Sequence, residues 1–252
     1  MKRHFFYILA SVAVMSACTV EGTYTGERPE PPPPPPQGEP MSLTTQGAGD
    51  KTISMSGSGT VYIDWGDGST NESHTLSPAQ ISNFSHSYSA TTKSIIQIFG
   101  NNISYLKCNK CQLTALGVSK NTALAELFCS INQLKEVDVS KNTALKKLDC
   151  SFNQLSSLNI EKNTALTELS CNNNELTNFN ASHNLSLISL DISTNKLTTT
   201  SLDFLLGTLH NIMFVEEKII YIAINPGTGD SQKSVAQTNG WTVDDNRVWV
   251  VE

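Results

Sequence analysis

The chain has 252 residues, and its 17 Lys and Arg against 23 Asp and Glu give a formal net charge of −6. This acidic balance, with no basic cluster along the chain, argues against nucleic acid as a partner, because binding to phosphates depends on Lys and Arg. No segment holds the roughly 20 consecutive apolar residues that a membrane-spanning helix needs. A retained transmembrane anchor is therefore not expected.

Residues 1–17 have the features of a secretory signal peptide. Two basic residues precede an apolar run over residues 5–15, and the small residue Ala17 stands before Cys18. The stretch Met15-Ser16-Ala17-Cys18 resembles the lipobox of bacterial lipoproteins, which implies cleavage before Cys18, acylation of its thiol and a lipid anchor in the outer membrane. The alternative is ordinary cleavage after an alanine, with Cys18 incidental. The sequence leaves open whether the anchored protein faces the periplasm or the cell surface.

Residues 18–40 read as a tether. Eight of the ten prolines lie between Pro29 and Pro40, and the stretch contains almost nothing that could be buried. Because a polyproline segment rises about 3.1 Å per residue and stays stiff, the tether should hold the folded part tens of ångströms from the lipid. A proline-rich ligand for another domain is the alternative.

Residues 41–100 predict a small β-sandwich. Three stretches with alternating or clustered apolar residues, 52–55, 61–65 and 94–99, indicate short strands. The step Gly66-Asp67-Gly68-Ser69 predicts a tight turn, because glycine adopts positive φ at no steric cost.

The same residues carry a resemblance to a known module. Asp64-Trp65-Gly66-Asp67-Gly68-Ser69 and His86-Ser87-Tyr88 resemble the signature of polycystic kidney disease (PKD) domains, which are extracellular immunoglobulin-like modules. One residue is missing between Trp65 and Gly66 and no clean G-x-Y-x-V follows Tyr88, so the closing strands are expected to be rearranged. Asp67 and His86 could suggest catalysis or a metal, but the resemblance implies that they hold the turn and the neighbouring strand together.

A strict 21-residue repeat fills residues 101–203. It is marked by four cysteines, Cys108, Cys129, Cys150 and Cys171. One unit runs Leu124-x-x-Leu127-x-Cys129-x-x-Asn132-x-Leu134, which resembles the leucine-rich-repeat consensus with Cys in the third apolar position. The order of a PKD-like module and these repeats is similar to leucine-rich-repeat lipoproteins of Bacteroidetes. The fold class expected is therefore mainly β, a solenoid of 21-residue coils behind a small sandwich.

The periodic positions also predict the interior of the solenoid. Leucines and cysteines that recur in register should line a continuous core. A column of side-chain amides should bond the backbone where each coil turns; it consists of Asn132, Asn153, Asn174 and Asn195. The pair Cys108-x-x-Cys111 could suggest zinc or redox chemistry, but no second pair completes a metal site. We expect reduced, buried thiols, no metal and no cofactor.

Residues 204–252 are expected to form a C-terminal α/β cap that covers the open end of the solenoid. Leucines at helical spacing follow Ser201, the expected N-cap, and residues 219–224 indicate a strand. Asp230 is the expected cap of a second helix over residues 231–239, which precedes a strand from Trp241 to Val243.

The residues on either side of the second leucine of each unit should point outward and form one surface. The residues proposed for it are Tyr105, Lys107, Glu126, Phe128, Lys147, Asp149, Glu168 and Asp191. Resemblance to leucine-rich-repeat proteins implies that this surface takes a protein ligand. The alternative is that its alternating charges only stabilise the stacked strands.

These features favour an exported, lipid-anchored binding or adhesion protein. An enzyme is not expected, since the histidines are scattered and no hydrolase, zinc-protease or phosphate-loop motif occurs. The alternative is a glycan-binding accessory of a polysaccharide-utilisation system, which would need aromatic platforms. The three tryptophans, Trp65, Trp241 and Trp249, lie in the PKD-like motif or in and after the cap. The sequence names neither the ligand nor the oligomeric state.

Overall fold

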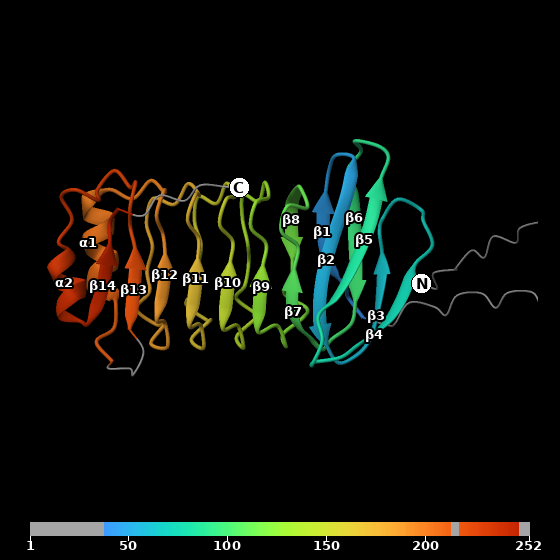
Figure 1. Cartoon of the computed structure of the whole chain (residues 1–252), viewed down its shortest axis with the longest axis horizontal. Helices are drawn as coiled ribbons and strands as arrows, with labels where there is room; N and C mark the ends of the chain where they lie inside the picture. The colour runs from blue at the N-terminus through green and yellow to red at the C-terminus, as the bar shows by residue number, and fades with distance from the viewer. Residues whose placement is uncertain (1–37, 213–216, 247–252) are drawn as a thin grey trace, which may run out of the picture. The chain divides into compact units, whose positions relative to one another are not determined.

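A computed structural model describes residues 38–212 and 217–246 of the chain. The predicted signal peptide, Cys18, most of the tether and Trp249 lie outside these residues. All described residues belong to one of the two compact units into which the chain divides, the unit that begins at Pro34. Within that unit, strands follow one another in a row, and two short helices pack beside the last of them (Figure 1).

Six strands form the N-terminal part of this unit. They are β1 (Met41–Thr45), β2 (Gly49–Gly57), β3 (Gly59–Asp64), β4 (Glu72–Leu76), β5 (Ser82–Tyr88) and β6 (Ser94–Phe99). The predicted stretches 52–55, 61–65 and 94–99 fall on β2, β3 and β6, and the predicted turn lies between β3 and β4. Gly66 is required there, because its φ is +73° and a Cβ would lie 2.3 Å from the backbone oxygen of Ile95.

The repeats supply the next strands, β7 (Ile103–Lys107), β8 (Leu113–Gly117), β9 (Glu126–Phe128), β10 (Lys147–Asp149), β11 (Glu168–Ser170) and β12 (Ser189–Asp191). From β7 through β9 to β12, adjacent strands are parallel and pair with a shift of one coil, so that Leu127, Leu148, Leu169 and Leu190 stand opposite one another. These leucines are at most 2% exposed. The columns of apolar residues predicted from the 21-residue period therefore do line the core.

The N-terminal strands and the coils share their sheets. One sheet has the order β4-β3-β6-β1-β8, and the other runs β14-β13-β12-β11-β10-β9-β7-β2-β5. Strand β2 pairs antiparallel with β7, and β1 pairs antiparallel with β8, a strand of the first coil. Buried side chains from Met41 to Trp241 form a single core. The first coil is consequently covered by backbone pairing as well as by side chains.

The C-terminal part of the unit contains α1 (Thr199–Thr208), β13 (Lys218–Tyr221), α2 (Lys233–Thr238) and β14 (Trp241–Asp244). The N-cap of α1 is Thr198, whose hydroxyl accepts from the Ser201 amide, so the prediction of Ser201 as the cap was wrong by three positions. Helix α2 begins after Gln232 without a side-chain cap, and Asp230 does not cap it. Helix α2 is also shorter than predicted.

Strand β13 extends the solenoid. It pairs in parallel with β12 on one side and with β14 on the other. The coil between β12 and β13 is enlarged, because it includes α1. The parallel ladder continues beyond the last repeat that the 21-residue period predicts.

Candidate protein-binding surface

Each central strand of the solenoid turns one leucine inward and the two flanking residues outward, because successive side chains of a strand point to opposite faces. The outward side chains of β7, β9, β10 and β11 stand in register. We call them the outer sheet surface; they are Tyr105, Lys107, Glu126, Phe128, Lys147, Asp149, Glu168 and Ser170. Parallel pairing thus brings together seven of the eight predicted surface residues.

Tyr105 and Phe128 form an aromatic pair on this surface. Their ring centroids lie 5.4 Å apart at an angle of 41°. Both side chains are half-buried, whereas the sequence predicted outward-pointing, exposed rings. Desolvation is the larger cause that raises the pKa of Tyr105, and the negative charge of Glu126 adds to it. The pair therefore contributes to the stability of the fold as well as presenting apolar area.

The neighbouring charges are paired along the sheet. Lys147 Nζ lies 2.7 Å from Glu168 Oε1, and this hydrogen bond raises the pKa of Lys147. Glu126 stands opposite Lys147 on the other side. Exposed pairs of this kind contribute at most about 1 kcal/mol. The predicted alternation of charge is present, and it supplies modest stability.

Asp149 and Asp191 occupy equivalent positions but differ in access to solvent. Asp149 is half-buried, whereas Asp191 is only 3% exposed. Asp191 Oδ1 accepts hydrogen bonds from the amide and hydroxyl of Ser193, and Tyr221 of β13 stands opposite it. Asp191 was therefore wrongly assigned to the surface, because the additional strand β13 lies beside it.

The predicted asparagine column bonds neighbouring coils as expected. Asn153 Oδ1 accepts from the Leu134 amide at 3.0 Å, and its Nδ2 donates to the carbonyls of Cys129, Cys150 and Ser151. Asn132, Asn174 and Asn195 make the equivalent bonds. The column has a structural role, because its side-chain donors and acceptors are already bonded to backbone groups of the coils.

Sequence reasoning missed two extensions of this network. A second column, Asn121, Asn142, Asn163 and Asn184, is at most 1% exposed and donates to backbone carbonyls of the preceding coil. The recurring Lys-Asn-Thr-Ala-Leu segment was its signal. Asn225 extends the first column by accepting from the Leu197 amide. The pattern Ile220-x-Ile222-x-x-Asn225 repeats Leu190-x-Ile192-x-x-Asn195 and could have revealed it.

The cysteines are free thiols in the described part of the chain. Cys108, Cys111, Cys129, Cys150 and Cys171 are all buried. Burial raises the pKa of each of the four thiols that follow the 21-residue period. A neutral buried thiol packs as a small apolar group and is a poor nucleophile. No group of three potential metal ligands occurs among residues 38–212 and 217–246.

Asp67 lies in the turn after β3 and His86 lies on β5, and the two side chains contact each other. His86 Nε2 is 2.7 Å from Asp67 Oδ2, and the His86 ring stacks on Trp65 with centroids 5.0 Å apart. Tyr88 donates its hydroxyl to the Trp65 carbonyl at 2.6 Å. These contacts join the turn after β3 to β5, so Asp67 and His86 have a structural role.

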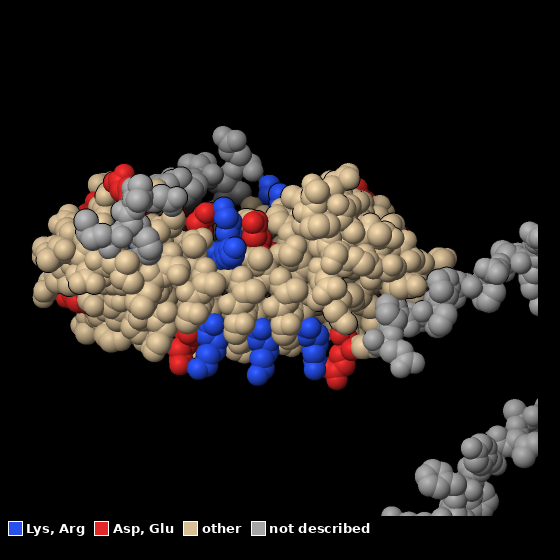
Figure 2. All heavy atoms as spheres, turned by 90° about the horizontal axis from the view of Figure 1, so that it is seen from below, with Lys and Arg blue, Asp and Glu red and all other residues tan. Residues whose placement is uncertain are grey.

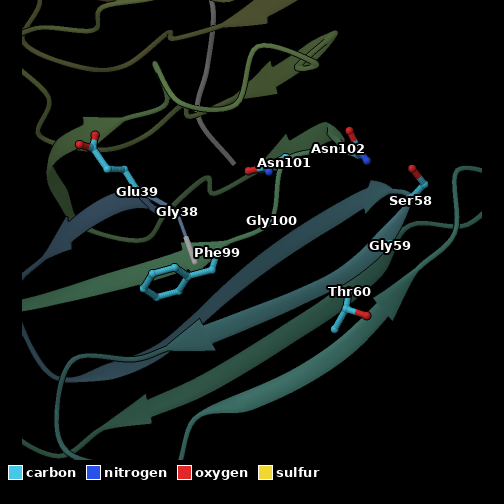
Figure 3. Close-up of a pocket in the computed structure, with 9 residues that line it drawn as sticks. All are labelled: Gly38, Glu39, Ser58, Gly59, Thr60, Phe99, Gly100, Asn101 and Asn102. Atoms are coloured by element: carbon cyan, nitrogen blue, oxygen red, sulfur yellow. The ribbon is translucent and has the colours of Figure 1, made fainter. Parts of the chain in front are cut away.

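Two other surface features are weaker candidates for a functional site than the outer sheet surface. A hollow of about 180 Å³ lies among residues 38–39, 58–60 and 99–102, where the side chains of Glu39, Thr60 and Phe99 do not converge (Figure 3). Lysines stand in a row along one face (Figure 2). Lys120, Lys141 and Lys162 recur with the 21-residue period and are exposed. Lys120 pairs with Glu39 and Lys162 with Glu161, so acidic residues partly neutralise these lysines.

None of the described helices has the length and hydropathy needed to cross a bilayer.

Among known proteins, only solved structures resemble this chain in the comparisons made by family model, curated sequence and structure. No protein-family model and no curated protein matches the chain. Among solved structures, an internalin (InlF) from Listeria monocytogenes is 19% identical over 55% of this chain, with a TM-score of 0.46. The functional domain of InlJ from the same organism, described as including a cysteine ladder, is 20% identical over 54% of the chain, with a TM-score of 0.29. The leucine-rich-repeat domain of APL1B is 20% identical over 48%, with a TM-score of 0.41.

The chain covers 39%, 47% and 38% of these three structures. All three TM-scores are below 0.5. Parallel strands in one-coil register, leucine columns and an asparagine column together make a leucine-rich-repeat solenoid.

Proposed function

We propose that this protein is an exported, lipid-anchored binding protein that takes a protein ligand on the outer sheet surface. The observation that carries the proposal is the half-buried Tyr105–Phe128 pair beside Lys107, Asp149 and the paired charges of β10 and β11. Aromatic residues with a charged surround are the usual composition of a binding hot spot. A protein-interaction scaffold is also the role that a leucine-rich-repeat solenoid suits.

The lipid anchor rests on the sequence before the described residues. The lipobox-like segment ending at Cys18 and the proline-rich tether supply an attachment site and a spacer. Several acyl chains bury enough methylene groups to make attachment effectively permanent. We propose that the protein is anchored in the outer membrane of a bacterium, with residues 41–100 acting as a PKD-like module that caps the repeats.

A glycan ligand is less favoured than a protein ligand. Sugars stack on exposed aromatic rings, but Trp65 is 1% and Trp241 is 2% exposed. Their ring faces are therefore unavailable in this fold. Binding of the purified protein to a carbohydrate array at micromolar concentration would reverse this preference.

Site-specific photocrosslinking in intact cells tests the proposed binding surface. A photoreactive amino acid at position 107, which is exposed on β7, should form covalent adducts with a protein. The same amino acid at position 136 is the control, because Glu136 is exposed but lies outside the outer sheet surface. Adducts from position 107 alone support the proposal. No adduct from position 107, or equal adducts from both positions, would contradict it.

Cell fractionation tests the anchor separately. Cys18→Ala should move the protein from the membrane fraction to the soluble fraction, because no other acylation site is expected. Retention of the variant in the membrane pellet would refute the lipoprotein proposal. Protease treatment of intact cells then distinguishes a surface-exposed protein, which is digested, from a periplasmic one, which is protected.

A further inference from the structure

One backbone position of every coil has a left-handed conformation. It lies two positions after the repeating cysteine or its equivalent, directly before the asparagine column. Its φ lies between +51° and +57° at Lys110, Ile131, Phe152, Asn173, Thr194 and Ile224. Ile131 N donates to Ser151 O at 3.0 Å and Phe152 N donates to Asn172 O at 3.0 Å, so bonds to the next coil impose this conformation.

The residue types at this position differ in how well they tolerate it. Asparagine adopts positive φ readily, and Asn173 shows that a coil of this solenoid accepts asparagine there. A β-branched residue such as Ile131 and a bulky one such as Phe152 are strained in the same conformation. Both are only half-buried, so packing recovers part of the cost. The same φ recurs in the other coils, so the strain belongs to the repeat; what distinguishes Ile131 and Phe152 is that two apolar side chains occupy this position on neighbouring coils.

Ile131 and Phe152 border a hollow of about 210 Å³ at the carboxyl ends of β9, β10 and β11. Small polar side chains leave the space open; they are Ser130, Ser151 and Ser170. Pockets for small-molecule ligands usually measure about 300–1,000 Å³. This hollow is therefore suited to a single side chain of a larger partner.

A carboxylate lies in the same hollow. Asp149 Oδ1 accepts from the amide of Ser151 at 3.0 Å and from its hydroxyl at 2.6 Å, which fixes the side chain. Asp149 Oδ2 has no hydrogen-bond or ion-pair partner among the described residues, and the nearest lysine along β10, Lys147, is bound to Glu168. An oriented anion with one free oxygen is complementary to a cation.

We propose that this hollow receives an arginine side chain of the protein ligand. The inference deepens the proposed protein-binding function and rests on it. The guanidinium donates to Asp149 Oδ2, and its flat face and aliphatic stem lie against Phe152 and Ile131. Arginine fits better than lysine because its planar group is more weakly hydrated and stacks on aromatic rings.

A panel of synthetic peptides tests the proposal on the purified full-length protein. Each peptide carries arginine between two leucines, and matched peptides carry lysine, leucine or citrulline, which has nearly the shape of arginine without its charge. We expect the arginine peptides to bind at least tenfold more tightly than the citrulline peptides. Asp149→Asn, which keeps the Oδ1 acceptor for Ser151, should remove this preference.

A paired substitution separates binding from folding. Ile131→Asn together with Phe152→Asn introduces the residue that Asn173 already shows to fit. Thermal unfolding should be unchanged or should occur at a higher temperature, whereas binding of arginine peptides should fall at least tenfold. Thr194→Asn changes the same position two coils away from Phe152 and should leave binding unchanged.

Each contrary result has a defined meaning. Equal binding of arginine and citrulline peptides, no binding of any peptide, or unaltered binding by the Asp149 and Ile131/Phe152 variants overturns the arginine site. If position 107 still forms protein adducts in cells in that case, the proposed binding function survives. If position 107 forms no adducts while arginine peptides bind the hollow, the cellular function is wrong and the site stands.

Discussion

Asn153 offers the sharpest test of how the coils are held together. In Asn153→Ala the Leu134 amide loses its acceptor, and the donor bonds to three carbonyls disappear. Each of these carbonyls keeps another donor, namely Asn132 for Cys129, Asn174 for Cys150 and the Ile131 amide for Ser151. The main cost is therefore a buried amide without an acceptor, about 1–3 kcal/mol, with a smaller contribution from the lost bonds.

We expect the free energy of unfolding of Asn153→Ala to fall by about 2–3 kcal/mol. For a chain of this size the unfolding temperature should drop by roughly 4–12 °C, since each kcal/mol shifts it by about 2–4 °C. Urea and thermal unfolding followed by circular dichroism measure both quantities. Gln154→Ala, at the exposed neighbouring position, is the control and should change stability by less than about 0.5 kcal/mol. A loss below about 1 kcal/mol for Asn153→Ala would show that the column does not bind the coils.

Asn153→Asp adds a pH dependence to the same test. Aspartate keeps the acceptor for the Leu134 amide but places a carboxylate beside three carbonyls, so its pKa in the folded state should be raised. A raised folded-state pKa means that the variant is most stable below the unfolded pKa of about 3.9 and loses stability as the pH rises through the folded value. Stability that does not fall between pH 4 and pH 7, about the range spanned by that titration, would contradict this.

Three further predictions concern the core, the aromatic pair and the N-terminal turn. Leu148→Ala should lower the free energy of unfolding, measured in urea, by about 2–5 kcal/mol, because the adjoining coils cannot collapse into the cavity. The control Glu136→Ala should leave it nearly unchanged, and equal losses for both variants would mean that Leu148 does not point inward. Phe128→Ala should lower the free energy of unfolding by about 0.5–1.5 kcal/mol through loss of its contact with Tyr105, and no change would mean that the two rings do not stabilise each other. Hydrogen bonds from Ser69 and then His86 lower the pKa of Asp67 to about 2. Its stabilising effect should therefore be present above the unfolded value and lost as the pH falls toward 2, and thermal unfolding of Asp67→Asn should lack this acid-dependent loss.

The sequence predicted the repeated interior well because the period itself encodes it. Leu127, Leu148 and Leu169 recur with the 21-residue period, and parallel pairing in one-coil register places them opposite one another. The strand expected over residues 219–224 is present as β13, but the period could not predict that it joins the parallel ladder, since α1 enlarges the coil before it and Asn225 therefore follows Asn195 by more than one repeat length. The burial of Asp191 was missed for the same reason.

The candidate surface was predictable in outline only. Alternation along β9 and β10 placed Glu126, Phe128, Lys147 and Asp149 on one face. It could not predict that the Tyr105 and Phe128 rings meet diagonally and half-bury each other, because this depends on side-chain orientation. The hollow beside Asp149 was also beyond the sequence, since it arises from the left-handed backbone and from small serines on adjacent coils.

The place of Asn225 in the asparagine column bears on how this chain could be redesigned. The bonds of Asn225 match those of Asn195 although the coil between them is longer than the regular 21-residue unit. Extra chain is therefore accommodated after Leu197, where α1 takes it up, without disturbing the shared ladder. The equivalent positions after Leu134, Leu155 and Leu176 are natural points at which a peptide could be grafted, while deletion of a complete 21-residue unit should preserve every inter-coil bond pattern.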